Sequence, residues 1–175
     1  MVPELHSKRF HLRELRIEDA SSYFNLMSNH SAVKYYGREP MQDISMIESE
    51  FIDIREKIRS NKLIRWAVIE TDTNSYIGHV GIKDFNNNHK RGTLSCIISP
   101  NQWGKGYGRE SLTLVIKYCW DSLRLNRLQV FVDPRNTRAV RMFLHLGFKI
   151  EALLKEYEYE YDMYVDLLIM SIIKE

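Results

Sequence analysis

The sequence predicts a single domain of the α/β or α+β class, and three observations lead to this prediction. Its length fits one domain, so residues 1–175 are expected to fold together. Apolar residues recur with a helical period in some segments and form short strand-like runs in others. Between residues 93 and 132 a strand, a helix and a second strand follow one another, which predicts a parallel pair within a mixed sheet.

The first half of the chain predicts two helices and four strands. Apolar residues three and four positions apart indicate helices at residues 20–27 and 44–58. Strands are expected at residues 11–15, 64–69, 76–85 and 93–99. Because only the turn-rich segments TDTNS and NNNHKRG separate the last three strands, we expect these strands to form an antiparallel meander.

The second half predicts two further helices and three further strands. The helices are expected at residues 109–123 and 137–146. Gly147 follows the second of them, at the position where glycine commonly ends a helix. Strands are expected at residues 128–132, 148–153 and 163–173.

The charge balance and the cysteine spacing narrow the possible functions. Lys and Arg number 25 against 23 Asp and Glu, so a nucleic-acid partner held by a broad basic surface is not expected. The N-terminal stretch lacks the apolar core of a signal peptide, and the longest apolar run is too short for a membrane span, so we expect a cytoplasmic protein without a membrane partner. Cys96 and Cys119 are expected to be buried free thiols, with a disulfide or a metal pair as the alternative.

A glycine-rich turn carries the chemistry. Gly104, Gly106 and Gly108 alternate between a predicted strand and a predicted helix. Alternating glycines let successive backbone N–H groups converge on an anion, and the helix N-terminus adds positive charge there. Lys105 and Arg109 add full charges, so the turn predicts a phosphate or pyrophosphate ligand.

The turn does not match two common phosphate motifs. A dinucleotide fingerprint would need another glycine at position 109 or 111, where Arg109 and Ser111 stand. A nucleotide-binding P-loop would need Ser or Thr directly after Gly-Lys, where Gly106 stands. A glycine-rich turn without any ligand remains the alternative.

The whole chain resembles the GNAT (Gcn5-related) acetyltransferases. The family's glycine motif, Q/R-x-x-G-x-G/A, corresponds to residues 103–108, with Trp103 in place of the Gln or Arg. The form W-G-K-G-Y is similar to that of the RimJ/RimL-like ribosomal-protein acetyltransferases and the related spermidine acetyltransferases. The spacing from Asn136 to Gly147-Phe148, the segment from Arg9 to Ala20, the IGHVGI strand and Asp166 agree as well.

The resemblance implies a fold and a co-substrate. The fold is a twisted mixed sheet of about seven strands with about four helices, in which strands 93–99 and 128–132 splay apart to admit acetyl-CoA. The pyrophosphate would lie on backbone amides of the glycine turn, and the pantetheine arm would lie along the end of strand 93–99. Asn136 would bind the pantetheine amides while also capping the helix that follows. The implied cofactor-binding residues are Ile97, Ile98, Trp103, Gly104, Lys105, Gly106, Tyr107, Gly108, Arg109, Asn136 and Phe143.

The catalytic acid and base cannot be assigned by the resemblance. Relatives often carry a Tyr acid where this chain has Phe143, a Ser where it has Ala139, and a Glu near Thr93 or Phe131. The enzyme would then rely on positioning and a water relay, or the protein would bind acyl-CoA without efficient turnover. The remaining titratable candidates, each more simply a surface or satisfied polar group, are Glu39, His79, Asp84 and His145.

The resemblance implies an N-acetyltransferase for a primary amine, with a protein N-terminal α-amine ranked first. A polyamine or another small amine is the alternative, and a non-catalytic acyl-CoA sensor is the alternative of another class. Tyr36 and Glu39, in the loop of residues 35–40, are the expected amine-binding residues. Residues 156–162 alternate acid and tyrosine, which would attract a polyamine or a basic peptide, or would form a solvated hairpin. Relatives often dimerise, so a homodimer is possible; no metal site is expected.

Overall fold

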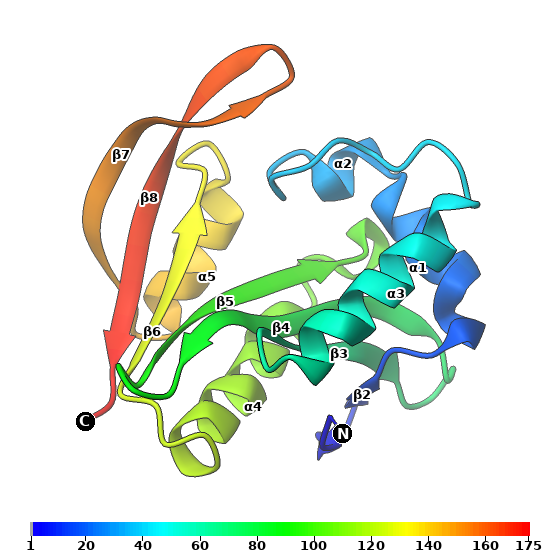
Figure 1. Cartoon of the computed structure of the whole chain (residues 1–175), viewed down its shortest axis with the longest axis horizontal. Helices are drawn as coiled ribbons and strands as arrows, with labels where there is room; N and C mark the ends of the chain where they lie inside the picture. Colours follow the sequence, from blue (N-terminus) through cyan, green and yellow to red (C-terminus); the bar gives the residue numbers. More distant parts are fainter. Residues whose placement is uncertain (1) are drawn as a thin grey trace.

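An open sheet of eight strands forms the centre of the fold in the computed structural model, which describes residues 2–175 (Figure 1). The strand order is β1-β2-β3-β4-β5-β6-β8-β7. The strands are β1 (Leu5–His6), β2 (Phe10–Glu14), β3 (Leu63–Glu70), β4 (Tyr76–Asn86), β5 (Arg91–Ile98), β6 (Arg127–Val132), β7 (Lys149–Glu160) and β8 (Met163–Ile173). The α-helices are α1 (Ala20–Met27), α2 (His30–Val33), α3 (Met46–Arg59), α4 (Tyr107–Asp121) and α5 (Thr137–His145).

The predicted mixed α/β architecture is confirmed, with one short strand and one short α-helix added besides two 3-10 turns. Strands β2 to β5 form the expected antiparallel meander, and β5 pairs with β6 in parallel. The additional elements are β1, of two residues, and α2, of four residues. Neither is long enough to produce a detectable period in the sequence.

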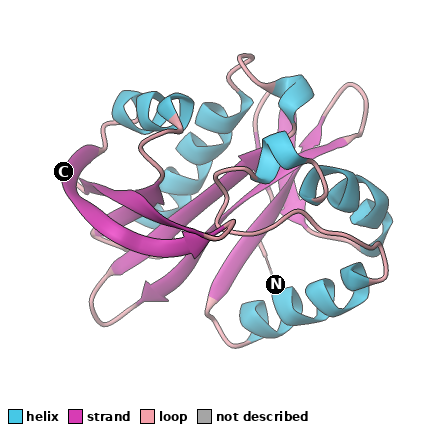
Figure 2. Cartoon of the chain, turned by 90° about the horizontal axis from the view of Figure 1, so that it is seen from above, coloured by secondary structure: helices cyan, strands magenta, loops and turns pink. Residues whose placement is uncertain are grey.

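Helices cover both faces of the sheet and enclose two apolar cores (Figure 2). Successive residues of β3 show the division: Trp66 and Val68 belong to one core, and Ala67 and Ile69 to the other. Side chains of a strand alternate between the faces of a sheet, so one buried strand serves both cores. Helices α4 and α5 contribute to the first core, and α1 and α3 to the second.

Strands β5 and β6 separate after a short seam. They pair over three positions only, Arg91 with Arg127, Gly92 with Leu128 and Thr93 with Gln129. Beyond these pairs the two strands diverge, and the expected splay is visible in Figure 1. The seam therefore divides the sheet into two parts and opens a gap beside the end of β5.

The hairpin of β7 and β8 extends further than the sequence predicted. Strand β7 continues past residue 153 to Glu160, so residues 156–160 of the acid and tyrosine segment lie in the strand, and residues 158–160 pair with β8 as part of a hairpin. A bulge interrupts the register between Leu154 and Glu158. At the bulge, Asp166 accepts a hydrogen bond from the Glu156 backbone N–H at 2.9 Å and pairs with Lys155 at 2.8 Å. The hairpin arches over the sheet toward α2 (Figure 1).

Cys96 and Cys119 are free thiols, as expected. Burial raises the pKa of each thiol to about 12, so both stay protonated at neutral pH. Within residues 2–175, none of the helices has the length and apolar character that crossing a membrane requires.

Candidate functional site

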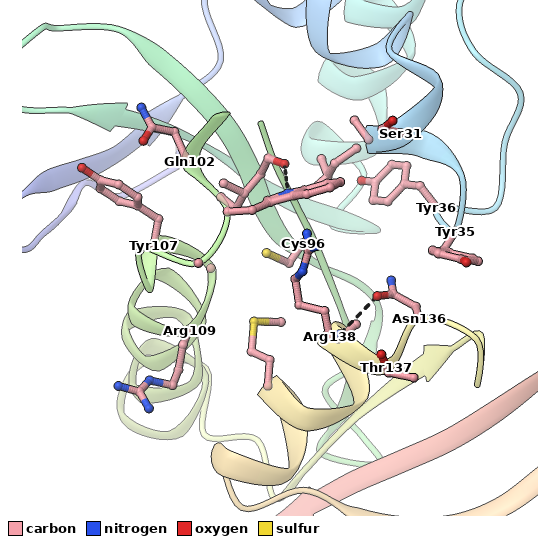
Figure 3. Close-up of a pocket in the computed structure, with 18 of the residues that line it drawn as sticks. Ser31, Tyr35, Tyr36, Cys96, Gln102, Tyr107, Arg109, Asn136, Thr137 and Arg138 are labelled. Carbon is pink, nitrogen blue, oxygen red and sulfur yellow. Dashed lines mark hydrogen bonds between the residues drawn. The ribbon is translucent and has the colours of Figure 1, made fainter. Parts of the chain in front are cut away.

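A cavity of about 800 Å³ lies in the gap between the diverging strands (Figure 3). Its walls are the end of β5, the glycine turn, the start of α5, and α2 with the residues that follow it. Tyr36 reaches into it from the α2 side, and Asn136 lies on the opposite wall. The cavity is therefore open to ligands that cross from one half of the sheet to the other.

The glycine turn has the backbone conformation that an anion nest requires. Gly104 and Gly106 have φ values of +77° and +86°, which residues with a side chain rarely adopt. Nothing lies within 4 Å of a Cβ placed on Gly104, so the backbone there is open to a ligand. Helix α4 begins immediately after Gly106 and adds its positive N-terminal end.

Arg9 attaches the glycine turn to the rest of the sheet. Its guanidinium donates to the Lys105 carbonyl at 3.0 Å and pairs with Glu110 at 2.6 Å. The same group lies 4.4 Å from the centre of the Tyr107 ring. The hydroxyl of Tyr107 donates to Glu70 at 2.6 Å, so this side chain is an anchor and points away from the cavity (Figure 3).

Trp103 connects the turn to β5 and to α5. Its indole N–H donates to the Ile98 carbonyl at 2.7 Å, and the Arg138 guanidinium lies 4.0 Å from the centre of its ring. Because Ser99 N–H donates to Ile77 on β4, alternation along the strand turns the Ile98 peptide groups to the gap and those of Ile97 to β4. A ligand pairing with this edge would therefore meet the Ile98 N–H, because the Ile98 carbonyl accepts from Trp103 and the Ile97 peptide groups face β4. Both residues line the cavity, and their contacts with a co-substrate stay predictions.

Asn136 caps helix α5, as expected. Its side-chain oxygen accepts a hydrogen bond from the Ala139 backbone N–H at 3.1 Å. This bond leaves its side-chain NH₂ group as a donor at the cavity wall. Next to it, Arg135 is held by the buried Asp133 at 2.6 Å. Capping and ligand contact are therefore compatible at this position.

The cavity brings together most of the expected residues. Those that line it are Tyr36, Ile97, Ile98, Trp103, Gly104, Gly106, Tyr107, Gly108, Arg109 and Asn136. The side chain of Arg109 points away from the cavity (Figure 3), so this residue takes part through its backbone. Lys105 and Glu39 lie outside the lining; the Lys105 ammonium donates instead to Gln102 at 2.8 Å.

Phe143 departs from its expected place. Its side chain is 3% exposed and packs edge-to-face on Phe148, with ring centres 5.2 Å apart, in the core beneath the cavity. Met142 lines the cavity instead. One residue along a helix rotates the side chain by about 100°, so adjacent positions face different surroundings.

Comparison with known proteins identifies the family. The acetyltransferase (GNAT) domain model matches residues 9–149. The chain belongs to the GNAT acetyltransferase family. It is 30% identical over 174 residues to the uncharacterized N-acetyltransferase YoaA of Bacillus subtilis, covering 99% of this chain and 98% of that protein. It is 31% identical over 150 residues to the spermidine N(1)-acetyltransferase of Escherichia coli K12, covering 86% of this chain and 77% of that protein.

A solved GNAT structure has the same fold over nearly the whole chain. It is the spermidine N-acetyltransferase from Vibrio cholerae in complex with CoA and spermine, with a TM-score of 0.85 and 26% identity. The likeness covers 95% of this chain and 96% of that one. This protein is therefore an acetyl-CoA-dependent N-acetyltransferase.

The cavity fits acetyl-CoA. The glycine turn, with its left-handed backbone and open space at Gly104, can bind the pyrophosphate through backbone N–H groups. The side of β5 that faces the gap and the Asn136 amide can hydrogen-bond the pantetheine arm. When bound, acetyl-CoA supplies an acetyl thioester that an amine can attack. We keep the individual contacts of the glycine turn, Ile98 and Asn136 as predictions.

Several lining residues were missed by sequence reasoning. They are Arg135, Arg138, Met142, Tyr35 and Cys96 among others. The segment RNTRAVR contained a usable signal, because its arginines are spaced by three residues around the predicted start of a helix. Met142 and Cys96 gave no signal, since apolar residues on a buried strand or helix look alike whichever cavity they face.

The four candidates for a catalytic acid or base differ in burial and in their position relative to the cavity. His79 is fully buried, with Nε2 2.9 Å from the Tyr36 hydroxyl and Nδ1 2.7 Å from the Tyr76 hydroxyl, so it is a satisfied polar group as expected. His145 lines the cavity, with Nδ1 2.7 Å from the Arg141 carbonyl oxygen. Glu39 and Asp84 are exposed and lie outside the lining.

Proposed function

We propose that the acceptor is a primary amine of a small polycation of the spermidine type. The observation that carries this proposal is a pair of carboxylates, Glu158 and Glu160, at the tip of the β7–β8 hairpin. A Cβ placed on Gly37 would lie 3.4 Å from a Glu158 oxygen and 3.6 Å from a Glu160 oxygen. Gly37 directly follows Tyr36, which lines the cavity, so the carboxylates stand beside its α2 end.

The carboxylate pair is suited to receive a cation. The pKa of Glu160 is raised by burial and by its hydrogen bond and charge repulsion with Glu158. A cation placed between the two groups would relieve this repulsion. Neighbouring cations are already engaged, Arg135 by Asp133 and Arg38 by Glu50 at 2.9 Å. Among residues 2–175 neither Glu158 nor Glu160 forms a salt bridge of its own.

The curated relatives support the same acceptor. Enzymes named for spermidine acetylation match at 31% and 27% identity, from Escherichia coli and Vibrio cholerae. A polyamine has a second ammonium several carbons from the reacting one, and a carboxylate pair at the cavity mouth would hold that second charge. A protein N-terminal amine, which the sequence alone ranked first, lacks this fixed second charge.

An acceptor panel tests the proposal. CoA-thiol release and product mass would be measured with spermidine, spermine, a monoamine and a short peptide with a free N-terminus. We expect spermidine or spermine to give the highest kcat/KM. We also expect the double variant E158Q/E160Q to raise the KM for spermidine about tenfold, the loss of about 1.4 kcal/mol of attraction, with little change for acetyl-CoA.

A matched control and a contrary result complete the test. Glu156→Gln removes a carboxylate from the same strand but outside the pair, and should leave the KM for spermidine unchanged. A higher kcat/KM for the peptide, or equal spermidine KM values in wild type and double variant, would overturn the polyamine assignment.

A further inference from the structure

A chain of buried hydrogen bonds joins the reaction cavity to a second cavity. Tyr36 lines the first cavity, and Tyr76 lines a second one of about 320 Å³ between α1, the start of β4 and the turn after β5. His79 lies between them, with one ring nitrogen bonded to each hydroxyl. We propose that Tyr36, His79 and Tyr76 form a proton relay for acetyl transfer, in which Tyr36 meets the reacting groups and the other two residues position and connect it.

The second cavity is a suitable end for such a relay. Its walls include Ser22, Asn25, Asn29 and Ser99. These side chains are polar and uncharged, and their hydroxyl and amide groups can hydrogen-bond water. On the α2 side of the reaction cavity, Tyr36 is the lining residue that hydrogen-bonds to His79; its neighbours in the lining are Ser31, Ala32, Lys34 and Tyr35.

His79 is held in its neutral form by its surroundings. Burial lowers its pKa well below the usual value, and the charges of Arg65 and Arg38 lower it further. The Tyr23 ring stacks on it at 5.3 Å with an interplanar angle of 15°. The titratable and charged groups around this cluster are Asp19, Tyr23, Tyr36, Arg38, Glu50, Arg65, Tyr76 and Cys96.

A neutral imidazole bonded at both nitrogens gives the chain a direction. One nitrogen must accept a proton and the other must donate one. In the first tautomer, Tyr36 donates to Nε2 and Nδ1–H donates to Tyr76, so the Tyr36 oxygen keeps a lone pair for the cavity. In the second tautomer, Nε2–H donates to Tyr36, whose own hydrogen then faces the cavity. Each tautomer leaves all three side chains uncharged.

The two tautomers account for both proton transfers of the reaction. The amine nitrogen forms a bond to the thioester carbon, the C–S bond breaks with its electron pair on sulfur, and the nitrogen releases one proton. Tyr36 accepts that proton while its own passes to Nε2, the Nδ1 proton passes to Tyr76, and the Tyr76 proton passes to water in the second cavity. A proton entering by the reverse route reaches sulfur through Tyr36 and restores the first tautomer.

This route replaces the acid that the chain lacks at position 143. Phe143 has no hydroxyl and its ring is in the core, so it cannot donate a proton to the leaving sulfur. Tyr36 approaches from the opposite, α2 side of the cavity (Figure 3). The relay depends on the acetyltransferase activity but not on which amine is the acceptor.

Three tyrosine variants test the relay in kinetics. Tyr36→Phe and Tyr76→Phe each remove one hydroxyl of the chain, and Tyr23→Phe is the matched control, because its hydroxyl bonds Glu50 rather than His79. With whichever amine the wild type acetylates best, we expect each relay variant to lower kcat by about 10²-fold. The double variant should be no slower than the worse single variant, and the KM for acetyl-CoA should stay within about twofold, since proton transfer rather than binding is lost.

Two further measurements separate a relay from a structural role. The dependence of kcat on the fraction of D₂O should be curved for the wild type, because several protons move together, and linear for Tyr76→Phe. Nitrogen NMR of His79 in the free protein should show a neutral ring at pH 7. Its Nδ1 signal should move in Tyr76→Phe and its Nε2 signal in Tyr36→Phe.

The results that would overturn the relay are distinct from failure of the polyamine proposal. A Tyr76→Phe enzyme with the kcat of Tyr23→Phe would overturn it, whichever amine is used. A charged His79 ring at pH 7 would also overturn it, and this result needs no acceptor. Preference for a peptide over spermidine would contradict the polyamine assignment alone.

Discussion

Trp103 replaces the family's Gln or Arg with a side chain that makes two different contacts. Its N–H group occupies the Ile98 carbonyl, and its ring supports Arg138. A glutamine could make the first contact but would offer no aromatic face for the second. The substitution therefore couples the glycine turn to the start of α5, two walls of the cavity that come from different halves of the sheet.

Gly106 provides a direct test of the pyrophosphate site. A Cβ there would meet only the Arg9 guanidinium, at 3.6 Å, so a small side chain has room. Its φ of +86° strains any side chain, but Asp and Asn adopt positive φ more readily than other residues do. We expect Gly106→Asp to fold and to lose the acetyl-CoA-induced thermal shift, because its carboxylate would repel the pyrophosphate. At a ligand concentration of 100 Kd, the wild type should gain about 2.7 kcal/mol from acetyl-CoA.

Gly106→Asn is the control for this measurement. It places a side chain of the same shape and backbone tolerance at the same position without the charge. We expect it to keep more of the thermal shift than Gly106→Asp does. Equal shifts for the wild type and folded Gly106→Asp would remove the glycine turn from the binding site.

At the scale of single residues, the sequence predicted conformations better than side-chain directions. The glycine turn and the Asn136 cap were predictable because left-handed backbone and helix starts restrict residue type. Which of Phe143 and Met142 faces the cavity was not predictable, because both are apolar and only the rotation of α5 against the sheet decides between them. The His79 cluster was also unpredictable, since its partners come from α1, β3, β4 and the segment after α2.

At the scale of elements, Asp166 controls the shape of the β7–β8 hairpin. It holds the Glu156 backbone in the left-handed region, at φ +51°, through the bond from the Glu156 N–H. The bulge that results is the bend between the sheet and the carboxylates at the hairpin tip. The Asp166 side chain, on β8, thus determines where Glu158 and Glu160 lie.

Replacing Asp166 should therefore affect the amine more than the co-substrate. We expect Asp166→Ala to raise the KM for the amine several-fold, because the bulge loses its acceptor and the hairpin tip shifts, while the KM for acetyl-CoA changes little. Asp166→Asn keeps an acceptor for the Glu156 N–H and should lie closer to the wild type. Steady-state kinetics with each substrate varied in turn decide the matter; a larger change in the KM for acetyl-CoA would contradict this role.

The elements that sequence reasoning found are those with a long apolar period or a turn signal. The regular spacing of apolar residues was enough to predict α3 and α4, and the glycine after α5 was enough to predict where that helix ends. The four residues of α2 were not detectable, and β7 was ended too early because its outer half alternates acid and tyrosine without a buried face. That half is ordered by pairing with β8, which no local pattern reveals.

At the scale of the whole molecule, two parts of one sheet are joined by a narrow seam. Only three residue pairs join β5 to β6. In the part of the sheet that contains β6, β7 and β8, side-chain contacts between the strands add to the backbone pairing. Arg127 of β6 pairs with Glu151 of β7 at 2.6 Å, and both contact Ser171 of β8. This cluster lies at the lower end of the hairpin, next to the seam.

The same cluster predicts a pH dependence of stability. The hydrogen bonds from Arg127 and Ser171 lower the pKa of Glu151 from 4.5 to about 2. Its ionised form therefore stabilises the fold fully above pH 4.5, and this contribution is lost as the pH falls toward 2. We expect Glu151→Gln to lower Tm at pH 7, with a difference from the wild type that shrinks as the pH is lowered through this range.

Asp121→Asn provides the comparison for the thermal melts. Its partner Lys117 is 75% exposed, so solvent screens the pair and its loss should change Tm only slightly. A Glu151→Gln Tm deficit that stays constant from pH 7 to pH 3 would show that the carboxylate charge is not the source of the stabilisation.

The bulge in β7 also bears on how copies of the protein behave at high concentration. Strand β7 ends the sheet order, so its outer side carries peptide groups that are not taken up by another of the described strands. A long, regular edge of this kind is a template on which further chains add and aggregate. The bulge at Glu156 twists the edge, and Lys149, Lys155 and Glu158 place charges along it. The aspartate that shapes the hairpin therefore also protects the molecule from edge-to-edge aggregation.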